Sequence, residues 1–597
     1  MPTKLKKNRI IDLIPFQMEN YPLDKAFCDK VTGSWRSYST KKAKEIIDKV
    51  SLGLIRLGVN PGDKIGIISG NRVEWNFVDI GILQIGAVNV PLYPNMSEDN
   101  YKYIFEDAGV KIVFVENKDL YKKVKNVEKR IENNLQGIYS FDKVDNANHW
   151  SEIIEKADEG NREVLNKLIE QITQDDLATI IYTSGTTGEP KGVKLTHFNI
   201  ISNVISLAEI MPHDTFSRTI SFLPLCHIFE RTAVYSYIYF GRSVHYPESM
   251  EKLGENIKEV KPHYFVTVPR LLEKIYEKIM SRARDLSFIK KTIFWWTVNL
   301  ANHFDHLGNN NWFYNLRLFF ARMLVFNKWI EGLGGEIKGI ISGSATLQPR
   351  LSRIFTAAGI QIIQGYGLTE TSPVLTSNTF EKGNYNLGTV GRTIPGVEIK
   401  IAENGEILAK GPNIMKEYYN RPDDTKKAID EKGWFHTGDT GKFVDGDFLK
   451  ITGRLKEIFK TSGGKFIIPQ PIENKMMESF FIEYIMVVGE NEKFAGALIL
   501  PEFGFLKKWY KGKGLHFESN YEMIKSERVK NRIMKEVNKY NKRFDHIQQV
   551  KKIALVSDPW SVETGEITPT LKLKRKVIKE KYQKEIESIY KDNSVDQ

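Results

Sequence analysis

The sequence predicts an α/β protein with more than one core, built around parallel, doubly wound sheets. The pattern of strands and helices predicts the sheets, and the chain length predicts the number of cores. Short apolar runs typical of buried strands alternate with helical patterns. The helical patterns cover residues 39–57 and 71–86, and the strand patterns cover residues 64–68, 87–91 and 112–115. The length of 597 residues also exceeds what one compact core accommodates. We therefore expect two or more cores.

The charge balance favours anionic partners without choosing among them. Lys and Arg number 86 against 74 Asp and Glu, a net charge of +12 that suits nucleotides, CoA, fatty carboxylates or an anionic membrane. Nucleic acid is not expected as a partner, since acidic and basic residues are interspersed and no nucleic-acid motif is present. The two cysteines, Cys28 and Cys226, provide neither a disulfide framework nor a metal cluster, which favours a reducing cytoplasm.

The N-terminal segment does not have the pattern of a secretory signal. It is basic, but Asp12 and Pro15 interrupt its short apolar run. The sequence also lacks a run of about 18 apolar residues, so we expect no membrane-spanning helix.

A loop between two strand patterns is the strongest candidate for a phosphate site. It follows the apolar run at residues 177–181, and residues 182–197 read YTSGTTGEPKGVKLTH. Glycines let backbone N–H groups approach an anion, hydroxyls add donors, and Lys191 adds a positive charge. The alternative is a surface turn rich in Gly, Ser and Thr. The loop offers Thr183, Ser184, Thr186 and Thr187 as hydroxyls and Gly185, Gly188 and Gly192 as glycines.

The loop is not a P-loop, because GxxxxGK[ST] followed by a helix is not matched and the chain continues as a second strand. It resembles instead the signature of the adenylate-forming, AMP-binding superfamily. The rest of the chain, from about residue 13 to residue 579, resembles the long-chain fatty acid–CoA ligase branch of that superfamily.

This resemblance implies a domain organisation and a set of ligands. Residues 1–453 would form a large N-terminal domain of doubly wound sheets plus a β-structured part, and residues 454–597 a small, mobile α+β domain. ATP and Mg²⁺ would bind the large domain, with Thr183 as a metal ligand and Thr186 in catalysis, and CoA would be the co-substrate. The chain would act as a monomer or homodimer.

After the loop, residues 221–232 read SFLPLCHIFERT. Alone, His227 would be interpreted as a packed core histidine. The resemblance implies instead that His227 lies beside the substrate carboxylate and lines the acyl and thiol site. Glu230 and Arg231 resemble the long-chain branch, and a structural ion pair is the alternative for them.

Residues 261–270 are expected to form a strand, and the following segment to residue 330 is helical in pattern and rich in aromatic and basic residues. Two interpretations compete. We favour an aromatic helix pair that packs on the domain and covers the acyl tunnel, since aromatic stripes are usually core. The alternative is a peripheral contact with an anionic membrane.

Two later segments are candidates for the adenine and metal sites. Residues 340–347, IISGSATL, combine a strand with a small-residue turn, and the resemblance assigns Ser344 and Ala345 to the adenine pocket. Residues 364–373 read QGYGLTETSP. Tyr366 offers an aromatic face for adenine, with Gly367 beside it. Thr369 offers a hydroxyl near the α-phosphate, and Glu370 a hard oxygen ligand for the Mg²⁺ that accompanies ATP.

Residues 433–473 contain the predicted ribose site and hinge. Asp439 would hold the ribose hydroxyls, with an Asp in a Gly turn as the alternative. Asp445, Gly446 and Asp447 are typical of a hairpin turn. The resemblance implies that Arg454 contacts the ribose, that the small domain rotates about Lys456, and that Gly463 and Gly464 belong to a loop at the thiol channel.

The basic segment at residues 565–576, GEITPTLKLKRK, is by charge alone a solvated tail. The resemblance places the adenylation lysine here and selects Lys572, with Lys574 as the alternative.

The sequence thus predicts ATP-dependent activation of a long-chain fatty acid through an acyl-adenylate, followed by thioester formation with CoA. The alternatives are an aryl-CoA ligase, a fatty acyl-AMP ligase that loads an acyl-carrier protein, and a non-catalytic nucleotide- or acyl-binding regulator. A cytoplasmic protein is expected, with peripheral association at the inner face of the membrane left open.

Overall fold

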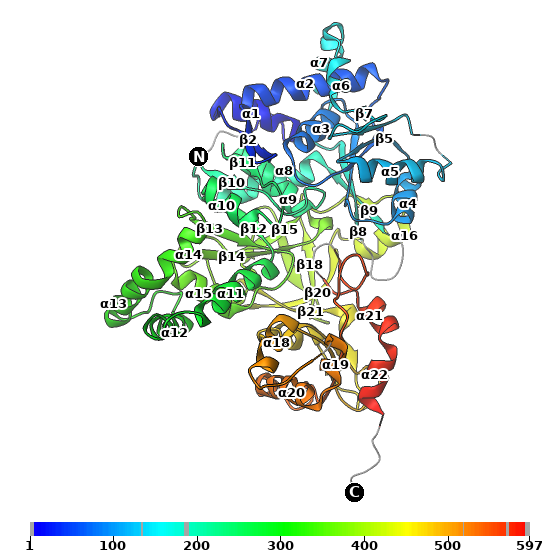
Figure 1. Cartoon of the computed structure of the whole chain (residues 1–597). Helices are drawn as coiled ribbons and strands as arrows, with labels where there is room; N and C mark the ends of the chain where they lie inside the picture. Colours follow the sequence, from blue (N-terminus) through cyan, green and yellow to red (C-terminus); the bar gives the residue numbers. More distant parts are fainter. Residues whose placement is uncertain (1–4, 133–134, 184–189, 518, 569–571, 592–597) are drawn as a thin grey trace. The chain divides into compact units, whose positions relative to one another are not determined.

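The computed structural model describes residues 5–132, 135–183, 190–517, 519–568 and 572–591 (Figure 1). The chain forms two compact units. The first contains Met1–Leu272, Arg282–Ile399 and Ala409–His436, and the second contains Glu273–Ser281, Lys400–Leu408 and Thr437–Gln597. The placement of a functional domain boundary at Arg454 stays a prediction.

An eight-stranded sheet in the first unit carries the predicted phosphate loop. Its core strands are parallel, and β8, β9 and β19 pair antiparallel at one side. In order across the sheet, the strands are β19 (Glu417–Tyr418), β9 (Lys191–Thr196), β8 (Leu177–Thr183), β4 (Val88–Leu92), β3 (Lys64–Ile68), β5 (Val110–Val115), β6 (Gly137–Ser140) and β7 (Asn148–His149). The predicted strands at residues 64–68, 87–91, 112–115 and 177–181 are therefore confirmed.

A nine-stranded sheet forms the other half of this unit. The strands from β14 to β1 run parallel, and antiparallel strands close both edges. The order is β16 (Arg392–Thr393), β15 (Val374–Ser377), β14 (Gln361–Gly367), β13 (Gly339–Ser342), β12 (Tyr264–Thr267), β10 (Arg218–Ile220), β11 (Ser243–Tyr246), β1 (Phe27–Val31) and β2 (Ser34–Tyr38). Two largely parallel sheets with helices between the strands confirm the doubly wound α/β class.

Helices cover these sheets as the periodicity predicts. The Ser39 side chain caps α2 (Thr40–Arg56) by accepting a bond from the Lys42 N–H at 3.1 Å. Every residue of α3 (Val73–Gln84) is buried, including the polar Glu74, Asn76, Asp79 and Gln84. The other helices of the unit include α1 (Leu13–Asn20), α4 (Glu98–Ala108), α5 (Lys118–Glu128), α8 (His197–Ile210), α9 (Ile228–Tyr239), α10 (Leu253–Val260) and α16 (Pro422–Ala428).

The segment at residues 127–176 is charged and weakly patterned, which predicts peripheral helices and loops, and the structure differs in part from this prediction. It contains α6 (Ser151–Glu155) and α7 (Arg162–Gln171), as expected. It also contains β6, which pairs parallel with β5 and extends the sheet. Four residues are too few for a periodicity of two to be recognised within a charged segment.

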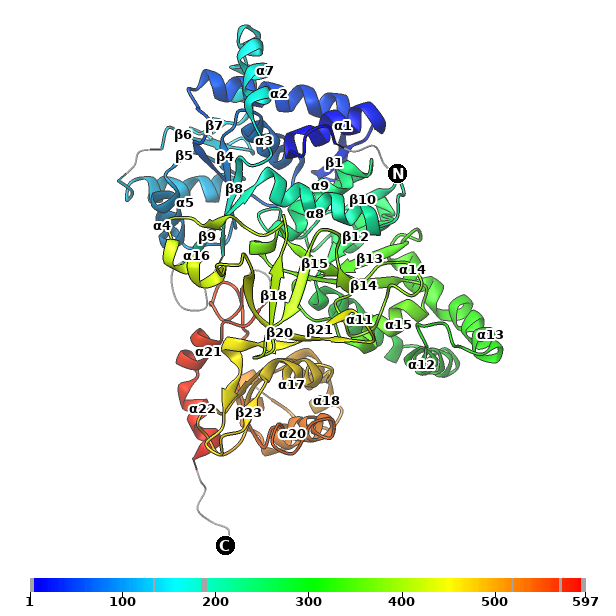
Figure 2. The same ribbon diagram turned by 180° about the vertical axis from the view of Figure 1, so that it is seen from behind.

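The aromatic segment forms helices, as predicted: α11 (Pro269–Arg284), α12 (Phe288–Asn302), α13 (Trp312–Ala321), the π-helix η3 (Arg322–Phe326) and α14 (Asn327–Gly332). Figure 2 shows α12 and α13 at the periphery of the first unit, with α14 and α15 (Pro349–Ala357) nearer the sheet. The interpretation of the aromatic stripe as packed core is correct only for the inner face, because many outer side chains are exposed.

Within the described residues, no helix has both the length and the apolar character needed to cross a bilayer.

The second unit has its own hydrophobic core around a three-stranded sheet of β24 (Ile482–Val488), β25 (Gly496–Pro501) and β26 (Lys552–Leu555). The helices that belong to this unit are α17 (Pro469–Met476), α18 (Phe503–Lys511), α19 (Asn520–Lys525), α20 (Glu527–Asn541), α21 (Arg575–Lys581) and α22 (Gln583–Tyr590). This mixture of helices and a small mixed sheet confirms the predicted α+β architecture.

Most of a four-stranded sheet also belongs to the second unit, with the order β17 (Glu398–Ile401), β18 (Glu406–Lys410), β20 (Phe435–Val444) and β21 (Phe448–Arg454). Strands β20 and β21 form the predicted hairpin. Its turn places Asp445 at φ 49° and Gly446 at φ 93°, the left-handed conformations that tight hairpin turns require.

Candidate active site

The predicted phosphate loop joins two paired strands. Thr183 ends β8 and Lys191 begins β9, and the two residues are register partners. The Thr183 hydroxyl lies 3.5 Å from the Lys191 carbonyl oxygen, at the limit of a hydrogen bond. Ser184, Gly185, Thr186, Thr187 and Gly188 lie outside the described residues, so their roles stay predictions.

The Lys191 ammonium has two neighbours from the segment around residues 418–424. Its Nζ lies 2.9 Å from Oδ2 of Asp424, in the first turn of α16, and 5.3 Å from the centre of the Tyr418 ring. The bond with Lys191 lowers the pKa of the Asp424 carboxyl. The lysine is thus held beside the loop by an ion pair and a cation–π contact.

Glu370 lies on the other side of Tyr418. It belongs to the short helix η4 (Thr369–Thr371), and its carbonyl oxygen accepts a bond from the Met415 N–H at 2.7 Å. The Tyr418 phenol donates to Glu370 Oε1 at 2.8 Å. Burial and the nearby Glu370 charge raise the pKa of Tyr418, so its hydroxyl remains a donor at neutral pH.

The structure therefore brings together two predicted residues, Lys191 and Glu370, that are far apart in the sequence. Tyr418 lies between them because β19 pairs with β9 and places Tyr418 opposite Val193. Tyr418 and Asp424 were not predicted from the sequence as site residues. The signal that could have found them is the run EYYNRPDD, where two aromatic residues precede a Pro-initiated helix with an acidic first turn.

The chemistry of this cluster fits a magnesium ion carried by a nucleotide. Among the described residues, no three His, Cys, Asp or Glu side chains are grouped so as to hold a metal by themselves. Mg²⁺ at nucleotide sites is commonly held by one or two carboxylates together with the phosphates. Glu370 would supply the carboxylate, with the Thr183 hydroxyl as the second predicted ligand.

The predicted adenine residues come from the ends of neighbouring strands. β13 and β14 are parallel, so their carboxyl ends lie at the same sheet edge. Ser344 and Ala345 follow β13, with Ser344 at φ 67°, while Tyr366 and Gly367 end β14. A Cβ at Gly367 would lie 1.7 Å from the Pro373 carbonyl oxygen, so only glycine fits there. Ligands commonly bind at this edge of α/β sheets.

Thr369 follows directly after this edge. Its side chain is buried, and it begins the helix η4 that also carries Glu370.

His227 is the N-cap residue of α9, and its Nδ1 accepts a bond from the Phe229 N–H at 3.2 Å. This bond leaves Nε2 as the protonated ring nitrogen in the neutral tautomer. The helix cap thus fixes the orientation of the ring.

The adjacent Glu230 and Arg231 do not form an ion pair with each other. The buried Arg231 pairs with Asp79 of α3, and its guanidinium also donates to the Thr179 hydroxyl of β8 at 2.9 Å. Burial raises the pKa of Glu230 to about 8. The Arg231 network therefore fixes α9, whose N-cap is His227, against the strand that leads into the predicted phosphate loop.

In the second unit, Asp439 and Arg454 are register partners on β20 and β21, and Arg454 Nε donates to Asp439 Oδ1 at 2.8 Å. The alternative of an Asp in a Gly turn is therefore wrong, since Asp439 lies within a strand. Lys456 follows in the short helix η5 (Leu455–Glu457).

The predicted thiol-channel loop is the turn of a small hairpin, β22 (Phe459–Lys460) and β23 (Phe466–Ile467). Gly464 has φ 74°, and both Gly463 and Gly464 are exposed. The open surroundings are compatible with a loop that contacts a ligand.

Lys572 is exposed, and its N–H donates to the Thr568 hydroxyl at 3.0 Å. The half-buried Arg575, three residues later, bonds to Glu473 at 2.5 Å and lies 3.4 Å from Glu457 Oε2. The sequence analysis interpreted this arginine as part of a basic tail. It instead fixes the segment after Lys572 against the residues around Lys456.

Comparisons with known proteins show the family to which the chain belongs. Residues 15–419 match the model of the AMP-binding enzyme family, and residues 456–594 match its AMP-binding enzyme C-terminal domain. A long-chain-fatty-acid–CoA ligase, FadD15, of Mycobacterium bovis is 31% identical over 576 residues, with 94% of this chain and 93% of the relative covered. Long-chain-fatty-acid–CoA ligase 1 of Homo sapiens is 30% identical, with 93% and 82% covered.

Solved structures share the fold at lower identity. The adenylation domain of a carboxylate reductase from Mycobacterium chelonae has a TM-score of 0.75 at 19% identity, with 98% of this chain and 91% of that chain covered. A Mycobacterium tuberculosis fatty acyl CoA synthetase has a TM-score of 0.63 at 21% identity, with 97% and 99% covered.

Proposed function

Because the chain belongs to the AMP-binding enzyme family, in its long-chain fatty acid–CoA ligase branch, we propose that it converts a long-chain fatty acid, ATP and CoA into acyl-CoA, AMP and pyrophosphate. In the first step, a carboxylate oxygen attacks the α-phosphorus and the bond to pyrophosphate breaks. In the second step, the CoA thiol, having lost its proton, attacks the acyl carbon and AMP leaves. The protein supplies no covalent nucleophile.

The observation that carries this proposal is the cluster of Lys191, Tyr418 and Glu370 beside the phosphate loop. Lys191 would exchange Asp424 for a phosphate oxygen of ATP. Tyr418 would orient the Glu370 carboxylate, which with Thr183 would hold Mg²⁺. The ion would neutralise phosphate charge, while catalysis by the chain is mainly positioning and electrostatic stabilisation.

The remaining residues are assigned to the fatty acid, to the parts of ATP, to CoA and to the movement between the two steps. We propose that His227 lines the acyl site, that Lys572 neutralises charge in the adenylation step, and that Lys456 is the pivot between the two steps. The other assignments are Ser184, Gly185, Thr186, Thr187 and Gly188 for phosphate; Ser344, Ala345, Tyr366, Gly367 and Thr369 for adenine and the α-phosphate; Asp439 and Arg454 for ribose; and Gly463 and Gly464 for the thiol channel.

A cytoplasmic location with peripheral association at the membrane is part of the same proposal, because long-chain acids partition into bilayers. The protein would be a monomer or a homodimer.

The test is release of pyrophosphate and AMP from Mg²⁺-ATP with fatty acids of increasing length, each with and without CoA. We expect pyrophosphate release to require a long-chain acid and the thioester to form only when CoA is added. An acyl-adenylate that forms but does not react with CoA would indicate a carrier-protein acceptor. An absence of acid-dependent turnover would contradict the enzyme proposal and favour a binding protein.

A further inference from the structure

Exposed apolar side chains are concentrated on the helices α12, α13 and η3. Of the 21 large apolar side chains that are exposed in the described residues, 12 lie between Leu286 and Leu324. We call the outer surface of these helices the aromatic face. It is defined by Phe288, Ile289, Trp312, Phe313, Phe319 and Phe320, whose exposed fractions range from 44% to 85%. Exposed apolar side chains concentrated in this way indicate an interaction site.

The aromatic face is held by a well-packed inner side. Phe294 and Val298 of α12 and Leu318 of α13 are buried, and Trp329 packs edge-on against Phe355 of α15 at 5.9 Å between ring centres. The exposure of the outer side chains is therefore a property of folded, anchored helices. Figure 1 shows α12 and α13 forming an edge of the first unit.

The helices that form the aromatic face also carry basic side chains. Residues 282–330 contain seven Lys and Arg against two Asp. Lys290 and Arg317 are exposed, and the Arg317 guanidinium lies 5.7 Å from the centre of the Trp296 ring and 5.9 Å from that of Phe313. Apolar and aromatic side chains combined with cations are the pattern of a helix that lies in a membrane interface.

We propose that the aromatic face docks on the surface of an anionic phospholipid bilayer. The inference rests on the proposed function and deepens it, since the docked surface would put the enzyme where long-chain acids are dissolved. Charge complementarity favours the bilayer over a second copy of the chain, because two copies joined through this face would bring their cations together. Lipid phosphates would instead pair with Lys290 and Arg317 while the aromatic rings enter the headgroup region.

The experiment measures co-sedimentation of the full chain with vesicles of phosphatidylcholine alone and of phosphatidylcholine mixed with phosphatidylglycerol. We expect binding to the mixed vesicles and about tenfold weaker binding to the neutral ones. The apolar variant combines Phe288→Ser, Trp312→Ser and Phe319→Ser. Its binding to the mixed vesicles should be weaker than that of the wild type by at least about tenfold.

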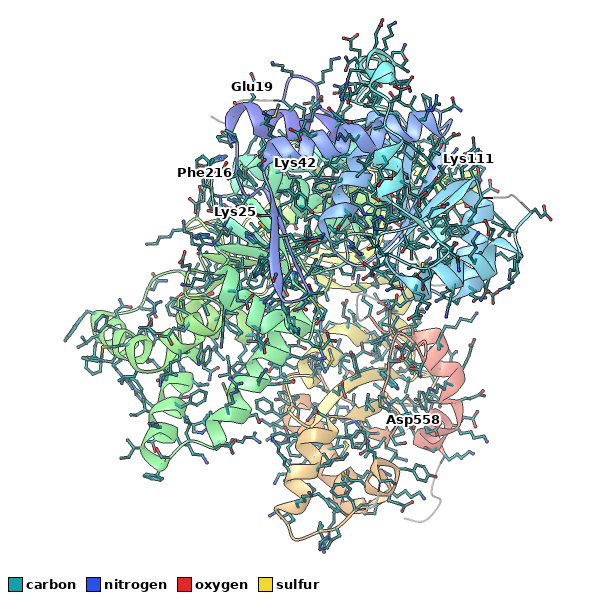
Figure 3. The ribbon with its side chains drawn as sticks, turned by 45° about the horizontal axis from the view of Figure 1, so that its top comes forward. Glu19, Lys25, Lys42, Lys111, Phe216 and Asp558 are labelled. Atoms are coloured by element: carbon teal, nitrogen blue, oxygen red, sulfur yellow. The ribbon has the colours of Figure 1, made fainter. Side chains whose placement is uncertain are left out.

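The matched control is Phe216→Ser. Phe216 and Phe319 are both 61% exposed, and Figure 3 shows Phe216 apart from α12 and α13 on the first unit. This variant should bind as the wild type does. A charge variant, Lys290→Gln with Arg317→Gln, should lose the preference for the anionic vesicles, and Lys42→Gln should keep it.

Turnover of a long-chain fatty acid dispersed in detergent, without vesicles, separates this inference from the proposed function. The apolar variant should keep this turnover within about twofold of the wild type, which also shows that it folds. Failure of the wild type to bind vesicles despite turnover would overturn the docking inference alone. The docking inference would also be overturned if the apolar variant bound the mixed vesicles as tightly as the wild type does. A wild-type dimer that the same three substitutions dissociate would overturn it as well. Absence of turnover with any acid would contradict the proposed function instead.

Discussion

The Tyr418 phenol donates to Glu370 Oε1 at 2.8 Å, while the ring of the same tyrosine lies 5.3 Å from the Lys191 ammonium. One side chain thus contacts both the predicted metal ligand and the predicted phosphate-binding cation. A phenolic hydrogen bond restricts the orientation of the carboxylate that accepts it, and a cation–π contact restricts the position of the ammonium. Tyr418 therefore positions two groups that we propose to act on the same substrate, ATP.

The first prediction concerns this hydrogen bond. Tyr418→Phe keeps the ring beneath Lys191 but leaves Glu370 without the phenolic donor. We expect acid-dependent pyrophosphate release to fall about tenfold, equivalent to about 1.4 kcal/mol, with a higher Mg²⁺ concentration needed for half-maximal rate. The measurement is the Mg²⁺ dependence of the rate. The neighbouring Tyr419→Phe serves as the control, and an unchanged Mg²⁺ dependence in Tyr418→Phe would contradict the assignment.

The ion pair of Lys191 with Asp424 leads to a second prediction. ATP must compete with the Asp424 carboxylate for the lysine, so Asp424→Asn should lower the KM for ATP. Since partly exposed pairs contribute only up to about 1 kcal/mol, the change should be about two- to fivefold. Lys191→Ala should raise the same KM. Steady-state kinetics at varied ATP tests both, with Asp423→Asn as the neighbouring control; a raised KM in Asp424→Asn would show that the carboxylate assists nucleotide binding.

The architecture was largely predictable because its signals are local. Strands such as β3 are continuous apolar runs between turn residues, and α2 has both a 3.6-residue apolar period and a serine cap. β6 was missed because four residues within a charged segment carry no measurable period.

Candidate site residues could be predicted only where they lie within one continuous sequence motif. Lys191 and Glu370 stand out as residue types in a pattern, but the tyrosine between them depends on the pairing of β19 with β9, which joins segments more than 200 residues apart. The alternative of an ion pair between Glu230 and Arg231 is wrong for the same reason. Asp79 lies on α3 and comes into contact with Arg231 only through tertiary packing. Glu230, the neighbour of Arg231 in the sequence, is buried and does not pair with it.

The adenylation lysine is the subject of the third prediction. Lys572→Ala should abolish formation of the acyl-adenylate and spare thioester formation from supplied acyl-adenylate and CoA. Loss of one cation at the phosphates typically costs about a hundredfold or more in such steps. Lys574→Ala is the matched comparison, because both lysines lie between Thr568 and α21. The reverse result would select Lys574, and equal loss of both half-reactions would contradict the role.

The exposed loop between β22 and β23 allows a fourth prediction. Gly464 has φ 74°, so Gly464→Val combines backbone strain of about 1–2 kcal/mol with a bulky side chain. Thioester formation should slow selectively, while pyrophosphate release on the first turnover should remain. Single-turnover assays of the two half-reactions measure this, and Gly514→Val, at φ 70° in another turn, is the control for backbone strain. Unchanged overall turnover would rule out the channel role.

The buried Glu230 leads to the fifth prediction, on the pH dependence of stability. Burial raises the pKa of Glu230 from about 4.5 to about 8 in the folded state, so between these values the folded protein holds a proton that the unfolded chain has lost. Folding then takes up a proton, and stability falls as the pH rises through this window, by up to about 1.4 kcal/mol per pH unit.

Glu230→Gln cannot titrate and removes this dependence. The difference in Tm between the variant and the wild type should therefore shift in favour of the variant from pH 5 to pH 8, and thermal unfolding at unit steps of pH measures it. The control is Glu163→Gln, which replaces a carboxylate whose side chain is 79% exposed and should leave the pH profile unchanged. A constant difference between wild type and Glu230→Gln over this range would show that Glu230 is already ionised in the folded protein. In that case a cation or a set of hydrogen-bond donors must stabilise its charge.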